Sequence, residues 1–234
     1  MNEIKNYLVT GASSGIGLAI CKSLLVQGHQ VTGIARRIAS ELQDERFYAV
    51  TMDFTNSNTL EEKFKSVLKT QPKWDGLICA AGYGQFAFIE QFSYQQMQTM
   101  MNVNFMAHAL LVKLILPGLK QQKQGNVIFI GSESALEGGK NGAMYCASKF
   151  AIRGFAQALR AECARSGVNI NLINPGMVKT PFFDKLDFRP GNAEENYLEA
   201  DDVANMVCHI LSMRKGSNID EINLSPLKHV IQFD

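Results

Sequence analysis

The chain has 234 residues, a net charge of +1 and 46% hydrophobic residues, which fits one α/β domain whose core requires no disulfide or metal. This balanced charge gives no electrostatic reason to expect a nucleic-acid or membrane partner. The five cysteines are scattered without metal-ligand spacing, so we expect no metal, and reduced thiols in a cytoplasmic protein. We find neither an apolar run of membrane-spanning length nor a signal-peptide pattern.

Strand-type and helix-type segments alternate along the chain. We expect strands at residues 7–10, 30–35, 47–52, 74–81, 126–130, 169–173 and 221–224, and helices at 18–27, 58–70, 94–116, 143–166 and 201–213. Gly28 is expected to end the first helix, and Pro117 with Gly118 to stop the third. The alternation predicts a single domain over residues 1–234, built on a doubly wound parallel sheet of about seven strands with helices on both faces. The irregular stretch at about 179–199 is expected to be a substrate loop.

A glycine-rich turn, Thr-Gly-Ala-Ser-Ser-Gly-Ile-Gly at residues 10–17, joins the first strand to the first helix. Gly11 allows a tight turn, while Gly15 and Gly17 let a diphosphate and a neighbouring strand approach the backbone. The N–H groups at the start of the helix attract an anion. In this setting the turn predicts a dinucleotide site, although an ordinary turn is the alternative. Its expected residues are Gly11, Ser13, Ser14, Gly15, Ile16 and Gly17.

The second strand ends in Arg36 and Arg37, about twenty residues beyond the turn. An acid at this place binds an unmodified ribose, whereas arginine accommodates a 2′-phosphate. No acid follows until Glu41, so we predict NADP rather than NAD as the cofactor. A solvated pair of surface arginines is the alternative.

Tyr145 and Lys149 are four residues apart on a predicted helix, so their side chains share one face. Lowering the pKa of a phenol from about 10 to about 7 takes roughly 4 kcal/mol, which one ammonium and a cationic cofactor can supply in a partly dry site. Such a tyrosine exchanges protons near neutral pH. Ser132 lies thirteen residues upstream, at the end of a predicted strand. By itself, the pair also suits a half-buried tyrosine beside a solvated lysine.

Together these elements resemble the short-chain dehydrogenase/reductase family over nearly the whole chain. The turn at 10–17 is similar to the family's Thr-Gly-x-x-x-Gly-x-Gly, and the gap from Ser132 to Tyr145 matches that of the family. Asn104 matches a catalytic asparagine, and Asn-Pro-Gly at 174–176 matches a segment that cups the nicotinamide. The resemblance implies a Rossmann-type fold and an NADPH-dependent oxidoreductase that acts on carbonyls or alcohols by hydride transfer.

The resemblance also implies residue roles. Tyr145 is the general acid or base, Lys149 lowers its pKa and holds the nicotinamide ribose, and Ser132 hydrogen-bonds the substrate oxygen. Asn104 positions a water that links Lys149 to solvent. Besides Tyr145 and Lys149, the implied cofactor residues are Asp53 against the adenine, Ala81 and Gly82 through their backbone, and Pro175, Gly176, Val178 and Thr180 around the nicotinamide. Alternatively, Ser132 caps the strand end, Asn104 satisfies the backbone of its helix, and Asp53 caps the next helix.

Two regions depart from the family pattern. Residues 79–82 read Cys-Ala-Ala-Gly where many members have Asn-Asn-Ala-Gly, so side-chain support of the central strand is expected to be lost. The ending at 219–226 is similar to a branch that includes dehydrogenases of small hydroxy acids and generalist carbonyl reductases. It is less similar to the 3-oxoacyl-carrier-protein reductases.

The expected substrate pocket is apolar and aromatic, which suits a hydrophobic carbonyl, although plain core packing is the alternative for each wall residue. Its walls are expected from residues 84–88 and from Leu136, Met144, Met177, Phe182 and Phe183. Lys140, Lys179 and Lys185 either meet an anionic substrate or are solvated.

Family members commonly pair the helices equivalent to 94–116 and 143–166 across a two-fold axis, so we predict a homodimer or homotetramer. Two rival functions remain open. One is a regulatory or sensor protein that binds NADPH without turnover, and the other is a scaffold built on the helix pair.

Overall fold

The computed structural model of the chain describes residues 3–38, 41–55, 57–214 and 216–233. Its centre is a seven-stranded sheet in the order β3-β2-β1-β4-β5-β6-β8, in which every neighbouring pair is parallel. The strands are β1 (Asn6–Thr10), β2 (Gln30–Ala35), β3 (Phe47–Thr51), β4 (Gly76–Cys79), β5 (Gly125–Ile130), β6 (Val168–Pro175) and β8 (Glu221–Leu224). The strand order reverses between β1 and β4, where doubly wound sheets bind ligands. The predicted Rossmann-type fold is confirmed.

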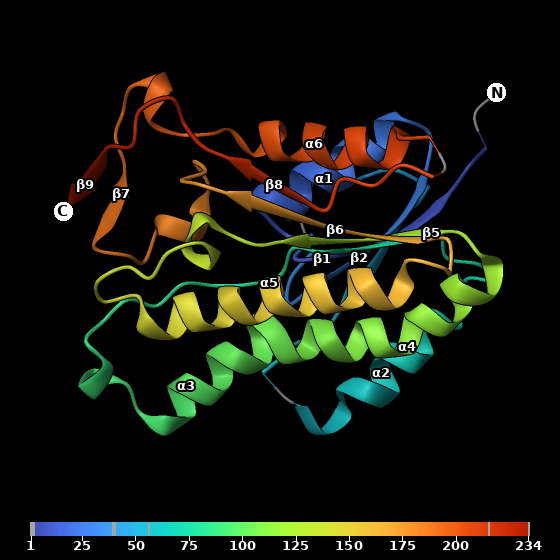
Figure 1. The fold of residues 1–234 in the computed structure, drawn as a ribbon, viewed down its shortest axis with the longest axis horizontal. Helices are drawn as coiled ribbons and strands as arrows, with labels where there is room; N and C mark the ends of the chain where they lie inside the picture. The colour runs from blue at the N-terminus through green and yellow to red at the C-terminus, as the bar shows by residue number, and fades with distance from the viewer. Residues whose placement is uncertain (1–2, 39–40, 56, 215, 234) are drawn as a thin grey trace.

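Helices cover both faces of the sheet (Figure 1). One face carries α1 (Gly15–Val26) and α6 (Ala200–Ser212), and the other carries α2 (Leu60–Leu68), α4 (Ala107–Gln122) and α5 (Ala143–Cys163). Each face has its own buried core, with Ile20 and Val203 on the α1 side and Phe64 and Phe129 on the α4 side, all fully buried. Because the helices cover both faces, only the two edges formed by the strand ends remain for a ligand.

One helix continues through a proline. The prediction ended it at Leu116, but α4 runs on to Gln122, and Lys123 closes it with φ 52°. A proline inside a helix lowers stability by roughly 3 kcal/mol, and this applies to Pro117, which is exposed inside α4. Burial of Leu116 and Leu119, at about 1.5–3 kcal/mol for each fully buried leucine, offsets it. The predicted end was wrong because packing beyond the proline overrides local propensity.

The same helix is continuous from Tyr94 to Gln122, through α3 (Tyr94–Met101), a π-helical turn (Asn102–Met106) and α4. By length and composition it is apolar enough to cross a membrane, and 44% of its most apolar window is buried inside the fold. Core helices of soluble proteins have the same properties, and α4 packs into the core shared with α2 and the sheet. We therefore interpret it as a core helix.

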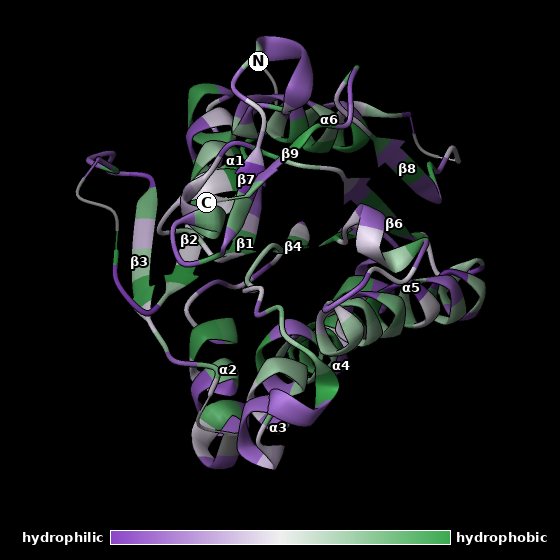
Figure 2. Cartoon of the chain, turned by 90° about the vertical axis from the view of Figure 1, so that its left-hand side faces the viewer, coloured by the Kyte–Doolittle hydropathy of each residue, from purple (hydrophilic) through white to green (hydrophobic). Residues whose placement is uncertain are grey.

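The predicted substrate loop is partly ordered by the C-terminal chain. Within it, β7 (Phe188–Pro190) pairs antiparallel with β9 (Ile231–Phe233), so the strand at 221–224 is not the last one. In Figure 1 this ribbon lies at the end of the molecule where β6 and β8 finish, and Figure 2 views it from that end. Strands of three residues give no periodic signal, which is why the sequence did not reveal them.

Candidate functional site

The turn between β1 and α1 is shaped to receive a phosphate group. Gly15 has φ 51°, and a Cβ on Gly17 would lie 2.2 Å from the carbonyl oxygen of Gly11, so side chains do not fit there. Ser14 is the N-cap of α1 and makes no side-chain cap hydrogen bond, which leaves the first N–H groups of the helix to a ligand. These features fit the diphosphate of a dinucleotide. The predicted residues Gly11, Ser13, Ser14, Gly15, Ile16 and Gly17 all lie in this turn or the first turn of α1.

Thr10 ties this turn to the end of β4. Its hydroxyl oxygen accepts hydrogen bonds from the backbone N–H groups of Ala80 at 3.0 Å and Ala81 at 3.1 Å. A Cβ on Gly11 would lie 2.9 Å from the Cα of Ala81, so the two loops touch. The side chain of Thr10 therefore supports the end of the central strand, where the sequence analysis expected this support to be lost because Ala80 replaces the asparagine common in the family. Ala81 lies against the turn, Gly82 lies next to Asn104, and their contacts with the cofactor stay a prediction.

Ser132, Tyr145 and Lys149 converge at the carboxyl edge of the sheet. Ser132 follows β5, the other two lie in the first turns of α5, and all three are 7–9% exposed. Nζ of Lys149 lies 5.7 Å from the ring centroid of Tyr145 and donates to the carbonyl of Ile130 at 3.1 Å. The Ser132 hydroxyl accepts from the N–H of Ser134 at 3.1 Å. Its own proton is thus available to Tyr145 or to a substrate.

Burial dominates the ionisation of these groups. It raises the pKa of Tyr145 to about 12, although the hydrogen bond with Ser132 acts in the opposite direction. It also lowers the pKa of Lys149 to about 8. In the chain alone, the cost of burying a phenolate therefore outweighs the groups that favour it. A tyrosine that works near neutral pH requires a further positive charge beside it.

Asn104 lies in the π-helical turn and joins the loop after β4 to α5. Its side-chain oxygen accepts from the N–H of Tyr83, and its side-chain nitrogen donates to the carbonyl of Tyr83 and to the hydroxyl of Ser148, each at 3.0 Å. A Cβ on Gly82 would lie 3.3 Å from that side-chain oxygen and 3.9 Å from Nζ of Lys149. The side chain of Asn104 therefore holds the loop, and its link to a water path stays a prediction.

His108, buried next to Asn104, was missed by the sequence analysis. Its Nδ1 is 3.2 Å from the main-chain carbonyl oxygen of Asn104, and its Nε2 is 3.1 Å from the hydroxyl of Thr10. Because a carbonyl only accepts, Nδ1 carries the proton, and Nε2 accepts from Thr10. Burial, and then the charge of Lys149, lower the pKa of His108 to about 4. The ring is neutral at pH 7, and its i, i+4 spacing from Asn104 is the signal that could have revealed it.

Arg36 and Arg37 follow β2 and are exposed at the same edge. Asp53 follows the neighbouring strand β3, and its carboxylate accepts from the N–H of Thr55 at 2.9 Å. This hydrogen bond, with smaller contributions from Arg36 and Lys63, lowers the pKa of Asp53. Asp53 therefore closes a local turn and does not cap the next helix, α2, whose N-cap is Thr59. It also lies close enough to Arg36 to share the region where a doubly wound sheet holds the adenosine ribose.

The chain beyond β6 returns to the glycine turn. Pro175 ends the strand and Gly176 donates its N–H to the carbonyl of Leu224 at 2.7 Å. A Cβ on Gly15 would lie 3.1 Å from the side chain of Thr180, so Thr180 lies against the turn. The predicted residues Pro175, Gly176, Val178 and Thr180 therefore run from the strand end to the phosphate turn, as a segment that cups the nicotinamide would.

Part of the expected substrate wall gathers around Tyr145. Phe86, Met144 and Phe182 pack with it in one cluster. The ring centroids of Phe86 and Phe182 are 5.2 Å and 5.8 Å from that of Tyr145, and Phe183 follows at 5.2 Å from Phe182. Leu136, Met177 and Phe183, which were also expected in the wall, lie outside this cluster.

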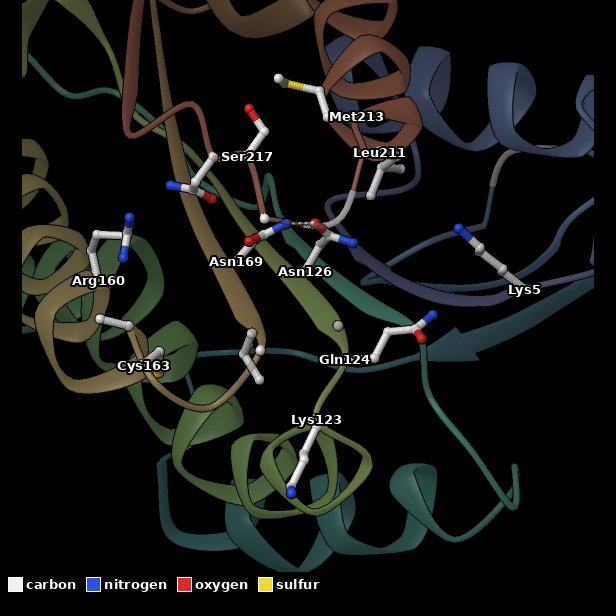
Figure 3. Close-up of a pocket in the computed structure, with 16 residues that line it drawn as sticks. Lys5, Lys123, Gln124, Asn126, Arg160, Cys163, Asn169, Leu211, Met213 and Ser217 are labelled. Carbon is white, nitrogen blue, oxygen red and sulfur yellow. Dashed lines mark hydrogen bonds between the residues drawn. The ribbon is translucent and has the colours of Figure 1, made fainter.

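Two hollows differ in their relation to this site. One of about 280 Å³ lies at the amino ends of β5 and β6, among the ends of α4, α5 and α6, and contains none of the predicted residues (Figure 3). The carboxyl-terminal ends of α4, α5 and α6 meet there and carry partial negative charge. Lys5, Lys123 and Arg160 on the wall of this hollow bring positive charge to it. The other, of about 290 Å³, is lined by the substrate loop and includes Thr180 and Phe183. The second hollow therefore adjoins the candidate site, and the first does not.

Comparisons with known proteins agree with this geometry. The family model for short chain dehydrogenases matches residues 5–189. An uncharacterized oxidoreductase from Staphylococcus epidermidis is 33% identical over 229 residues, covering 95% of this chain and 97% of that protein.

Solved structures give the same result. An alcohol dehydrogenase from the archaeon Thermococcus sibiricus, complexed with 5-hydroxy-NADP, has a TM-score of 0.85 and 28% identity, covering 97% of this chain and 99% of that one. A serine dehydrogenase complexed with NADP⁺ has a TM-score of 0.82 and 26% identity, covering 94% of both chains. The chain therefore belongs to the short-chain dehydrogenase family and is an NAD(P)-dependent dehydrogenase or reductase.

Proposed function

We propose that the protein reduces a carbonyl to an alcohol with NADPH, or runs the reverse reaction, with Tyr145 as the general acid or base. The observation that carries the proposal is the meeting of Ser132, Tyr145 and Lys149, all buried, beside the phosphate turn. A protein that only binds a dinucleotide requires the turn but has no use for a buried ammonium beside a buried phenol.

The residues divide the work of the reaction. When bound, the cofactor supplies the hydride that the carbonyl carbon receives, and NADPH becomes NADP⁺. Tyr145 gives its proton to the carbonyl oxygen, and Ser132 donates a hydrogen bond to that oxygen. Lys149, whose Nζ is held by the carbonyl of Ile130, favours the phenolate that remains.

The preference for NADP over NAD rests on Arg36 and Arg37. Both are exposed after β2, where arginine accommodates a 2′-phosphate, and two structural relatives were solved with NADP⁺ or an NADP derivative. We expect Arg36→Ala to lower the ratio of kcat/KM for NADPH to that for NADH by roughly tenfold, the effect of about 1.4 kcal/mol. The control is Lys113→Ala, which removes a cation whose side chain is 69% exposed on α4. Equal use of both cofactors, unchanged by Arg36→Ala, refutes the preference.

The loss of NADPH absorbance tests the reaction. The substrates are diketones, aromatic aldehydes, keto acids, a steroid and an acyl thioester. We expect Tyr145→Phe to lower turnover by about 10²-fold or more, as the loss of a positioned acid does, while Tyr48→Phe, on the exposed face of β3, leaves it unchanged. Tight NADPH binding with no turnover by the wild type favours the sensor instead.

The protein is proposed to form a homodimer or homotetramer through its continuous helix Tyr94–Gln122 and through α5. Met106 and Phe150 are 51% and 43% exposed there, more apolar surface than the helices need to pack on the sheet. Light scattering that gives a monomer at every concentration refutes it. The proposed cytoplasmic location agrees with five free thiols.

A further inference from the structure

Aromatic rings flank Tyr145 and enclose it. The ring centroids of Phe86 and Phe182 lie 5.2 Å and 5.8 Å from its own. Phe188 packs edge-on against Phe86, with ring centroids 4.9 Å apart. The ring centroid of Phe188 also lies 5.9 Å from that of Phe183. We call Phe86, Phe182, Phe183 and Phe188 the aromatic box. Because Tyr145 is 7% exposed, a substrate whose oxygen reaches its hydroxyl must contact this box.

The C-terminal residues 227–233, here called the strap, hold one wall of the box. β9 of the strap pairs with β7, and the ring centroid of Phe233 lies 6.3 Å from that of Phe188. Lys228 donates its N–H to the carbonyl of Glu195 at 2.8 Å, and its Nζ pairs with the Glu195 carboxylate at 3.0 Å. A strand of three residues has little stability without a partner. The strap therefore keeps Phe188 against Phe86.

The Glu133 carboxylate acts against a substrate with a negative charge. Glu133 directly follows Ser132, and besides burial its charge raises the pKa of Tyr145. A charge that opposes a phenolate at this place also opposes a carboxylate on the substrate. His229 of the strap lies 3.2 Å from the Glu133 carboxylate, so this charge is anchored next to the box.

Of the lysines that were candidates to bind an anion, Lys179 lines the hollow of the substrate loop but is engaged by a tyrosine there. Nζ of Lys179 lies 3.3 Å from the hydroxyl of Tyr197 and 4.6 Å from its ring centroid. Lys140 and Lys185 are exposed. A substrate carboxylate inside the box would therefore face Glu133 without gaining one of these cations.

We propose that the site takes a flat, uncharged aromatic carbonyl compound, such as an aryl ketone or an aromatic aldehyde, and that the strap supplies part of its wall. The inference rests on the proposed carbonyl reduction. Aromatic rings attract one another in edge-to-face and offset arrangements at these distances, so the ring of the substrate joins those of Phe86 and Phe188. The carbonyl carbon receives the hydride of NADPH and the oxygen receives the proton of Tyr145, which yields an aryl alcohol and NADP⁺.

Three carbonyl compounds separate the effects of charge and shape. Methyl benzoylformate has a ring and no charge, benzoylformate has the ring with a carboxylate, and methyl pyruvate has neither ring nor charge. With NADPH, we expect kcat/KM for methyl benzoylformate to exceed that for each of the others by roughly tenfold, as contact with two rings predicts. If benzoylformate or methyl pyruvate is reduced as well, the inference falls and carbonyl reduction stands. If the wild type reduces no carbonyl, the proposed function falls and the inference falls with it.

Two variants test the wall. Phe188→Leu and Phe233→Ala should each lower the preference for methyl benzoylformate over methyl pyruvate by about 2- to 10-fold, the value of one aromatic contact. The matched control is Tyr94→Ala, because Tyr94 and Phe233 are 74% and 76% exposed, and it should leave the preference unchanged. An unchanged NADPH affinity verifies that each variant is folded. An unaltered preference in folded Phe233→Ala overturns the role of the strap.

Discussion

The pKa of Tyr145 should fall when the oxidised cofactor binds. Its value in the chain alone is about 12, and bringing it near 7 takes roughly 7 kcal/mol, at about 1.4 kcal/mol for each pKa unit. Lys149, whose Nζ is 5.7 Å from the tyrosine ring centroid, is already present in that chain. One further positive charge about 6 Å from the phenolate would supply roughly 3 kcal/mol at an effective dielectric constant of about 20. The oxidised nicotinamide ring carries such a charge and the reduced ring does not, so bound NADP⁺ would supply about half of the roughly 7 kcal/mol.

The assay is a titration of tyrosinate absorbance in the near ultraviolet, with and without NADP⁺. Because the chain has six tyrosines, the signal is taken as the difference between wild type and Tyr145→Phe. We expect NADP⁺ to lower the midpoint of this difference by about two pKa units or more, corresponding to about 3 kcal/mol. A midpoint that NADP⁺ leaves unchanged would refute the electrostatic argument, and Tyr145 would then have to act as a neutral phenol only.

Three further predictions follow from single contacts. Acid should destabilise the fold through His108, because a histidine in the unfolded chain binds a proton near pH 6.5 but the buried ring does so only near pH 4. The free energy of unfolding should therefore fall by about 3 kcal/mol between these pH values, and urea melts of His108→Gln should show a smaller fall. Gly17→Ala should abolish NADPH binding, measured by fluorescence, because its Cβ would lie 2.2 Å from the carbonyl of Gly11; the control Gly118→Ala, where a Cβ meets nothing within 4 Å, should bind normally. Phe150→Glu places a charge on the exposed apolar face of α5 and should shift the mass by light scattering towards the monomer, and an unchanged mass contradicts the proposed interface.

The sheet and its helices could be predicted because their signals are local. Strands such as β4 and β5, covered on both faces, are almost wholly buried, and such strands appear in sequence as continuous apolar runs. The errors arose where distant contacts decide the structure. Pro117 lies inside α4 because Leu119 beyond it is buried, and β7 is a strand because β9, about forty residues later in the chain, pairs with it.

The residues of the candidate site were predictable for a different reason. Hydride transfer to a carbonyl demands a phosphate turn, a proton donor and a cation in fixed relation, so their spacing in sequence carries information. The electrostatic state of the site was not predictable, because the cost of burial at Tyr145 and Lys149 depends on how completely neighbouring segments cover them. The wall around Tyr145 depends in the same way on Phe188 and on the strap, which no local motif marks.

His108 shows why two motifs that were treated separately behave as one unit. Its protonated Nδ1 holds the carbonyl of Asn104, its Nε2 accepts from Thr10, and Thr10 in turn accepts from the N–H groups of the loop after β4. Each bond fixes the direction of the next, and a buried group left without its partner costs about 1–3 kcal/mol. The phosphate turn therefore cannot shift without disturbing Asn104 and, through the loop that Asn104 holds, the surroundings of Lys149. We therefore infer that one neutral imidazole links the turn proposed to bind the cofactor to the surroundings of the proposed proton donor.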